Sequence, residues 1–161
     1  MRLADFDWRT WRATDLCTLV FAVDRGRILL MRKKRGLGAW KINGPGGRLE
    51  PGEAPLAGAI REFREEVGAI PRGISWAGRN RFQFVDGYST DVHVFRASRF
   101  DGTPVETDEG VPFLCDLGTL PWDHMWTDDA LWLPHLLEGR AFSGRWLLER
   151  DHLLDWALEL L

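Results

Sequence analysis

Residues 47–69 read GRLEPGEAPLAGAIREFREEVGA, and this stretch carries the strongest pattern in the chain. Its apolar side chains recur at spacings of four, three and four residues, at Leu56, Ile60, Phe63 and Val67. That spacing is typical of one face of a helix. Gly68 follows, and glycine commonly ends helices. We therefore predict a helix over residues 54–67.

Three acidic residues share another face of this helix, because Glu62, Glu65 and Glu66 stand at positions i, i+3 and i+4. Like charges at this spacing destabilise a helix by ~0.2–0.5 kcal/mol per pair. One interpretation is a solvated acidic surface. The other is a cation site, since Mg²⁺ binds carboxylates together with substrate phosphates. The turn at residues 44–47, Gly-Pro-Gly-Gly, favours a cation site because it lets backbone approach the same place.

Short β-like runs alternate with turn residues before and after this helix. The runs are residues 15–23, 27–33, 79–85, 91–97 and 112–116. The tripeptides Asp24-Arg25-Gly26 and Asp86-Gly87-Tyr88 are predicted to close two hairpins. Between the first hairpin and the acidic helix, residues 35–47 contain five glycines and a proline, so most of that segment is predicted to be irregular.

The C-terminal third contains one predicted helix and one segment whose secondary structure stays open. Residues 128–138 have a helical pattern with an irregularity at Pro134. Residues 142–160 fit either a helix or a final hairpin, and the pattern leaves both open. Together the predicted elements indicate an α+β fold, a mixed β-sheet with a few helices packed against it.

Composition narrows the function classes. The 161 residues fit one domain over residues 1–161, in which residues 1–14 form an N-terminal extension without an assigned role. A net charge of −3 offers no basic surface for nucleic acid, so a polyphosphate ligand would need a cation. The longest apolar run, residues 16–23, is too short to span a membrane, and no signal-peptide pattern precedes it. We expect a cytoplasmic monomer with no membrane or nucleic-acid partner, in which Cys17 and Cys115 are buried, reduced thiols.

The stretch from Gly47 to Ala69 matches the Nudix box at every defined position: Gly, five residues, Glu, seven residues, Arg-Glu-apolar-x-Glu-Glu-x-Gly-apolar. The chain therefore resembles the Nudix hydrolases. This resemblance implies the Nudix fold, with helices packed on both sides of a mixed sheet as an α/β/α sandwich. It also implies a loop–helix–loop that binds Mg²⁺, or alternatively Mn²⁺, and hydrolysis of a nucleoside diphosphate linked to another group.

The same resemblance implies roles for individual residues. Glu62, Glu65 and Glu66 are implied as metal ligands or as the base that activates water, and Gly46 as a carbonyl ligand. Glu53 and Arg61 are implied to pair, with Arg61 fixing the geometry of the carboxylates.

Glu109, in the segment ETDEG, matches a further metal or catalytic acid of the family. The alternative for Glu109 is an exposed loop acid. We keep both interpretations at this point.

Segments outside the box resemble one branch of the family, the oxidised purine nucleoside triphosphatases (8-oxo-dGTP diphosphatases, MutT-related). They are KKRGLGAWKINGPGG, DVHVF, GTPVETDE and MWTDDALWLP. The resemblance implies a small-molecule nucleotide substrate. The first candidate is 8-oxo-dGTP, followed by 2-hydroxy-dATP and alkylated purine nucleotides. The implied substrate-binding residues are Thr18, Lys33, Leu37, Asn43, Phe82, Phe84, Trp126, Asp128, Asp129 and Trp132.

The polar members of this set suit a purine edge. Asn43 offers a donor and an acceptor in one plane. Burial and mutual repulsion would raise the pKa values of Asp128 and Asp129, so that one carboxyl stays protonated and donates. The alternative for Asp128 is a helix N-cap. Leu37, where the branch usually has an aromatic residue, makes substrate preference the open question.

Two other functions compete with this prediction. One is a Nudix hydrolase of ADP-ribose or of a dinucleoside polyphosphate. The other is a non-catalytic Nudix module that senses nucleotides, which the complete set of box acids disfavours.

Overall fold

The computed structural model describes residues 1–161, and its sheet begins with the predicted first hairpin. β1 (Asp15–Asp24) and β2 (Arg27–Lys33) pair in antiparallel fashion through a two-residue turn. Arg25 and Gly26 form that turn with φ angles of 54° and 76°. Positive φ at both central residues gives the turn whose twist matches that of paired strands, which explains why a glycine stands there.

Helix α1 (Pro55–Val67) confirms the predicted helix. A proline occupies its first position, and Gly68 ends it in the left-handed conformation at a φ of 73°. Phe63 and Val67 are fully buried, as predicted. The predicted apolar face is wrong at Leu56, which is 46% exposed. The first turn instead packs on the preceding loop through Gly58, where no side chain would fit.

β5 (Ile70–Phe84) and β6 (Ser89–Asp101) form a second hairpin that is far longer than the predicted runs 79–85 and 91–97. A bulge between Trp76 and Gly78 shifts the register of this pair. The shift breaks the alternation of apolar and polar residues on which the prediction relied, so the first half of the hairpin was missed.

The tail is the hairpin of β8 (Phe142–Glu149) and β9 (His152–Leu160), so the helical alternative is wrong. β7 (Gly110–Asp116) confirms the strand predicted at 112–116, and β3 (Ile42–Asn43) and β4 (Gly46–Arg48) are short. The sheet order is β3-β2-β1-β6-β5-β8-β9, with β4 on β1 and β7 on β2. Because β1 pairs with β6 and β5 with β8 in parallel, the sheet is mixed.

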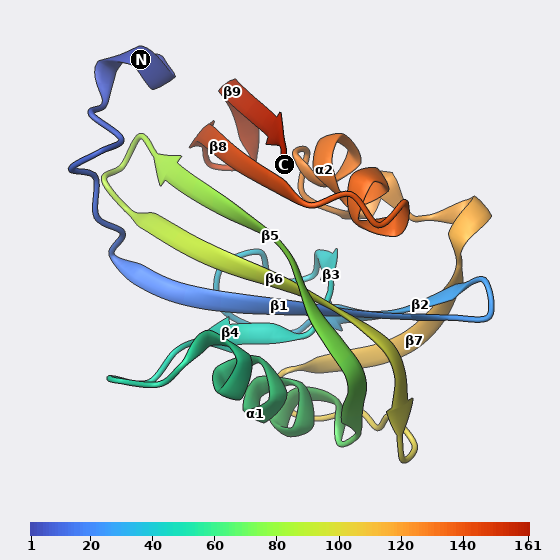
Figure 1. The fold of residues 1–161 in the computed structure, drawn as a ribbon. Coiled ribbons are helices and arrows are strands. Elements are labelled where there is room, and N and C mark those ends of the chain that lie inside the picture. Colours follow the sequence, from blue (N-terminus) through green and yellow to red (C-terminus); the bar gives the residue numbers. More distant parts are fainter.

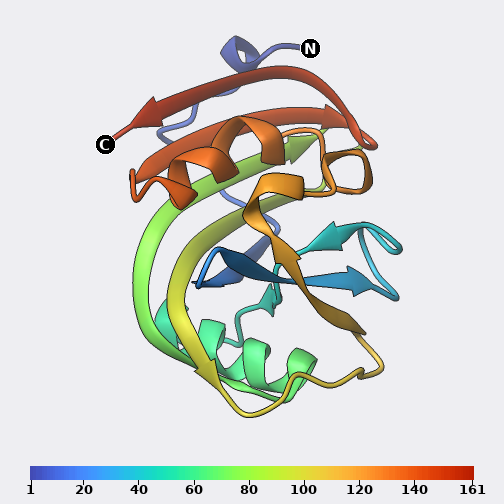
Figure 2. The same ribbon diagram turned by 90° about the vertical axis from the view of Figure 1, so that its right-hand side faces the viewer.

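Each face of the sheet carries a helix. In β1, Phe21 and Val23 face the core beneath α2 (Asp129–Leu137), whereas Val20 and Ala22 face the core beneath α1. Figure 1 shows α1 and α2 on opposite sides, and Figure 2 shows β5 and β6 curving between them. The predicted sandwich is therefore confirmed. Three short 3₁₀ helices complete the structure: η1 (Leu3–Asp5), η2 (Leu117–Thr119) and η3 (Trp122–His124).

The N-terminal extension packs against the end of the sheet. The backbone N–H of Leu3 donates to Asp155 at 2.9 Å, and the Trp11 indole donates to Gln83 at 2.8 Å. The prediction of two buried thiols is wrong, because Cys17 and Cys115 are both partly exposed. Neither helix combines the length and the apolar character that crossing a membrane requires.

Candidate active site

A cavity of about 810 Å³ lies where α1, the β2–β3 loop and the start of α2 face one another. It collects side chains that are far apart in the chain. Of the predicted site residues, the following line it: Thr18, Lys33, Leu37, Asn43, Gly46, Glu62, Glu65, Glu66, Phe82, Phe84, Glu109, Trp126, Asp128, Asp129 and Trp132. Glu53 and Arg61 do not line the cavity. Arg61 contacts the carboxylates of Glu62 and Glu65 from outside it, and Glu53 contacts Arg61.

Arg61 is the centre of the acidic end. Its Nε and Nη2 donate to the two carboxylate oxygens of Glu53 at 2.8 and 2.7 Å, and Nη1 donates to Glu62 at 2.7 Å. Further donors reach Glu65 at 3.2 Å and the backbone carbonyl of Arg48 at 3.1 Å. The guanidinium holds the pKa of Glu53 at about 2. Arg61 therefore fastens the loop before α1 to the acidic face of the helix.

Glu66 is the most enclosed of the box acids and is 6% exposed. Burial raises its pKa to about 8, and the neighbouring carboxylates of Glu62 and Glu109 add to this. The backbone N–H of Gly46 donates to its Oε2 at 3.1 Å and partly offsets the effect. Burial also raises the pKa of Glu62, whereas the Glu65 side chain is 59% exposed. The three acids share a face, as predicted, but differ sharply in burial.

Glu109 stands opposite this face, at the end of the loop before β7. Its backbone N–H donates to the hydroxyl of Thr107, which in turn donates to the carbonyl of Glu66 at 2.8 Å. Arg35 donates to the Glu109 carboxylate and lowers its pKa. Glu109 therefore lines the cavity from a loop, with its side chain 36% exposed, and its role as a metal or catalytic acid stays a prediction.

The acidic end fits a hard divalent cation by the chemistry of its donors. Glu62, Glu65, Glu66 and Glu109 offer only oxygen atoms. Burial, and then the charges of neighbouring carboxylates, raise the pKa values of Glu62 and Glu66. No three of these side chains already surround one point. Arg61 and Arg35 engage three of them as ion pairs.

The opposite end of the cavity contains the buried pair Asp128 and Asp129. The Trp132 indole donates to Asp128 Oδ2 at 2.7 Å, and the backbone N–H of Trp126 donates to Asp129 Oδ2 at 3.1 Å. Burial raises the pKa of Asp128 to about 6. Burial and then the charge of Asp128 raise the pKa of Asp129 further above its ordinary value.

Asp128 stands at the N-cap position of α2 and Asp129 is the acid of its first turn, as the alternative predicted, but Asp128 does not cap the helix through its side chain. Its backbone is already helical, with φ −74° and ψ −24°, and its side chain makes no cap hydrogen bond. Asp128 Oδ1 is buried without any partner in the protein. Trp132, predicted as a pocket wall, is itself almost fully buried and holds Asp128 in place.

Two more polar groups line the same cavity. Asn43 accepts a hydrogen bond from Gly44 N–H at 2.8 Å through Oδ1, which leaves its amide N–H groups available. The hydroxyl of Thr18 is buried and has no partner. Phe84 and Trp126 meet edge to face with ring centroids 6.1 Å apart. This end of the cavity is therefore an aromatic pocket with unsatisfied polar groups.

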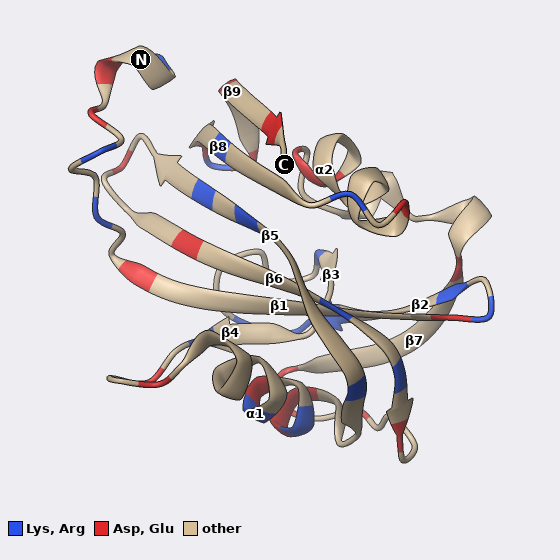
Figure 3. Cartoon of the chain, viewed as in Figure 1, with Lys and Arg blue, Asp and Glu red and all other residues tan.

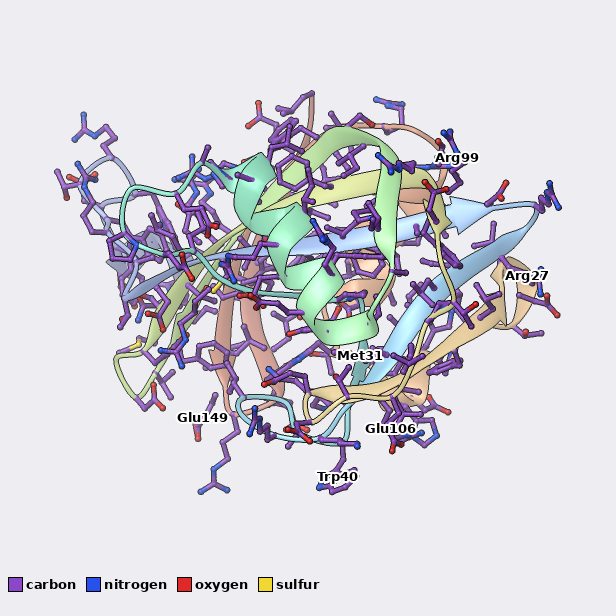
Figure 4. The ribbon with its side chains drawn as sticks, turned by 90° about the horizontal axis from the view of Figure 1, so that it is seen from below. Arg27, Met31, Trp40, Arg99, Glu106 and Glu149 are labelled. Carbon is purple, nitrogen blue, oxygen red and sulfur yellow. The ribbon has the colours of Figure 1, made fainter.

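The mouth of the cavity lies at the β2–β3 loop. The Lys33 ammonium donates to the carbonyl of Leu37 at 2.8 Å, and Leu37 is half exposed. Trp40 projects away from the same loop into solvent, as its label in Figure 4 shows. Sequence reasoning missed Arg35, Thr107 and Tyr88 as lining residues. The basic run at residues 32–35 was the available signal for Arg35, and no local signal marked Thr107 or Tyr88.

The chain is similar to known proteins over most of its length. A model of the NUDIX domain matches residues 13–136. The oxidized purine nucleoside triphosphate hydrolase of Danio rerio is 42% identical over 130 residues, which cover 80% of this chain and 83% of the relative. The one from Mus musculus is 38% identical over 145 residues, covering 89% and 93%. A solved mutator MutT protein from Bacillus halodurans, 25% identical, superposes with a TM-score of 0.80 over 90% of this chain and 97% of that one.

Proposed function

This chain belongs to the Nudix family of hydrolases. We propose that it hydrolyses a modified purine nucleoside triphosphate to the monophosphate and pyrophosphate, with 8-oxo-dGTP as the first candidate substrate. One observation carries the proposal. A single cavity joins the acidic face of α1 to the buried polar pair Asp128 and Asp129. The relatives from Danio rerio and Mus musculus, which are named for this activity, support it.

The aromatic end binds the base in this proposal. Phe82, Phe84 and Trp126 contribute apolar surface for a purine ring. Asp128 Oδ1, without a partner in the free protein, accepts a hydrogen bond from the purine edge. The raised pKa of Asp129 favours its protonated form, which donates. A purine with a different pattern of donors and acceptors leaves one of these buried groups unpaired, and this penalises the wrong base.

The phosphates lie toward the mouth and the acidic face. Lys33 and Arg35 line this end and supply positive charge to the phosphate oxygens. Glu62, Glu65, Glu66 and Glu109 would hold Mg²⁺, or alternatively Mn²⁺. The bound cation supplies neutralisation of the phosphate oxygens and of the charge that develops as the anhydride breaks.

A carboxylate of α1 receives the proton when water attacks phosphorus and the phosphoanhydride bond breaks. Glu62 and Glu65 both line the cavity and are proposed for this step. Arg61 contacts both, so it fixes where their oxygens stand. Arg61 and Glu53 are therefore positioning residues, since neither lines the cavity.

The first experiment measures kcat/KM with Mg²⁺ for 8-oxo-dGTP, 2-hydroxy-dATP, O6-methyl-dGTP, dGTP, dATP, ADP-ribose and diadenosine tetraphosphate. We expect a modified purine triphosphate to be preferred over its unmodified parent. Activity confined to ADP-ribose or the dinucleotide would retain Nudix chemistry and contradict the base pocket. Absence of turnover with all of them would favour a nucleotide-sensing module.

A second experiment tests the pocket. Asn43→Ala and Asp128→Asn should lose preference for the modified purine over dGTP by at least tenfold, a larger effect than on dGTP turnover itself. Asp123→Asn, an exposed acid on η3, is the matched control. An unchanged preference ratio in both pocket variants would show that these residues do not read the base.

A further inference from the structure

Two arginines stand side by side on the face of the sheet away from the catalytic cavity. Arg81 of β5 and Arg145 of β8 are direct partners in the register of these parallel strands. Figure 3 shows the basic bands of β5 and β8 next to each other. Like charges at facing positions destabilise strand pairing. The arrangement therefore lacks a stabilising role within the sheet.

The protein provides no acceptor for either guanidinium. Arg81 and Arg145 make no ion pair and no side-chain hydrogen bond, and the Nε of Arg81 is buried without a partner. The neighbouring Arg79 differs, because it forms a two-pronged pair with Asp91 at 2.8 and 2.5 Å. Asp91 also faces Arg81 in the register of β5 and β6, but both of its carboxylate oxygens bond Arg79, so neither Arg81 nor Arg145 has an ion pair of its own.

The two guanidinium groups face a separate cavity of about 440 Å³. Its other lining residues are Ser143, Ala157, Leu158 and Glu159. Glu159 is the only acid in the lining and forms no ion pair with either arginine. The ring of Trp8 covers both arginines, with its centroid 5.9 Å from the guanidinium carbon of Arg81 and 5.8 Å from that of Arg145.

Strand geometry separates this cavity from the active site. Successive residues of a strand point to opposite faces, so Arg81 and Phe82 lie on different sides of β5. Phe82 lines the catalytic cavity and Arg81 lines the second one. A ligand of the second cavity therefore does not compete directly with the substrate.

We propose that Arg81, Arg145 and Ser143 form a second binding site, which takes a phosphate group between the two guanidinium groups. Planar guanidinium groups match phosphate oxygens in two-pronged hydrogen bonds, and two adjacent ones suit an anion of more than one negative charge. The Ser143 hydroxyl adds a donor. The ligand is either a free phosphate or pyrophosphate ion or the phosphate of a nucleotide, and this site is independent of the proposed catalytic function.

The test titrates inorganic pyrophosphate, inorganic phosphate and AMP into the full chain in magnesium-free buffer. The indole N–H signal of Trp8 in NMR, assigned with Trp8→Phe, reports on this site, and that of Trp126 reports on the catalytic cavity. We expect a saturable shift of Trp8, with Kd raised at least tenfold in Arg81→Gln and in Arg145→Gln. Arg99→Gln, an exposed arginine of β6 that Figure 4 places at the edge of the molecule, should bind like the parent.

The three ligands separate the two sources of phosphate. Equal affinity for AMP and inorganic phosphate assigns the site to the phosphate group alone. At least tenfold tighter binding of AMP assigns it to a nucleotide whose base contacts Trp8. No Trp8 shift with any of them at 10 mM, or a shift that survives unchanged in both glutamine variants, would overturn the proposal.

Thermal unfolding distinguishes a binding site from a purely structural support for Trp8. Because Arg145→Gln removes a repulsion, its Tm without ligand should be equal to or above that of the parent, and the rise in Tm with pyrophosphate should be clearly smaller than in the parent. A lowered Tm together with an unchanged rise would show that Arg145 supports Trp8 and binds no anion.

Discussion

At the scale of single residues, burial rather than residue type separates the acids of the box. Glu62, Glu65 and Glu66 have the same side chain, yet Glu66 is enclosed and Glu65 is largely exposed. A buried carboxylate without a cation is costly, because its charged form is poorly solvated. The free enzyme therefore keeps an unfavourable charge arrangement in the place where the proposed cation would relieve it.

Glu65→Gln and Glu66→Gln should each reduce kcat by at least a hundredfold with Mg²⁺ while the fold is retained. Glutamine has the shape of glutamate but not its charge, so it is a weaker cation ligand and no base. Circular dichroism and steady-state kinetics check both points, with the exposed Glu138→Gln as control. Equal turnover in the parent and both variants would refute the proposed roles.

Asp128 should make the protein less stable as pH rises. Its pKa is about 6 in the folded protein, against about 4 in an unfolded chain, so the folded state binds the extra proton between these values. The free energy of unfolding should therefore fall by about 1–3 kcal/mol from pH 4 to pH 6. Urea unfolding at several pH values measures it.

Asp128→Asn should make this decline smaller but not abolish it, because Asp129 and Glu66, whose pKa values are also raised, still contribute to it. The variant should be more stable than the parent above pH 7. The control Asp123→Asn should follow the parent at every pH, since Asp123 is exposed. The same decline in Asp128→Asn as in the parent would mean that other groups cause it.

At the scale of elements, one arginine joins the loop at residues 48–53 to helix α1. Arg61 makes hydrogen bonds to Glu53, Glu62 and Glu65 and to the backbone of Arg48. A lysine in its place would carry the same charge but lacks the planar fork that reaches several acceptors at once. The shape of the side chain, more than its charge, therefore holds the loop–helix unit together.

Arg61→Lys should lower the free energy of unfolding by about 1–2 kcal/mol. It should reduce kcat roughly ten- to a hundredfold, with a smaller effect on KM, because misplaced ligands weaken chemistry more than base binding. Arg64→Lys, on the exposed side of the same helix, is the control and should behave like the parent. A change in KM alone would place Arg61 in substrate binding instead.

At the scale of the whole molecule, one sheet separates two cores and carries two cavities. The N-terminal segment reaches the far end of this sheet, where Leu3 bonds to Asp155 and Trp11 to Gln83. None of residues 1–12 lines the catalytic cavity. The segment is therefore placed to stabilise the C-terminal strands rather than to take part in hydrolysis.

Removal of residues 1–12 should lower Tm by about 5 °C, since it deletes these hydrogen bonds and the packing of Trp8 and Trp11. The kcat/KM for the preferred nucleotide should stay within twofold of the parent. Thermal unfolding and steady-state kinetics measure the two quantities. A tenfold loss of kcat/KM at unchanged Tm would give the segment a catalytic role.

The sequence by itself determined the features that depend on near neighbours. The helix with its acidic face, the Arg25-Gly26 turn and the Nudix box follow from residues a few positions apart, because helix and turn geometry act over that range. The residues predicted to line the cavity came from the family resemblance instead, because members of a family share a tertiary structure.

Only the tertiary structure decided what depends on distant contacts. It made residues 142–160 a hairpin by pairing β8 with β5, exposed Leu56, and left Cys17 and Cys115 partly accessible. It also brought Arg35 to Glu109 and set Arg81 beside Arg145. Burial, pKa and strand register are properties of which surfaces meet, and segments separated by tens of residues meet only when the sheet closes.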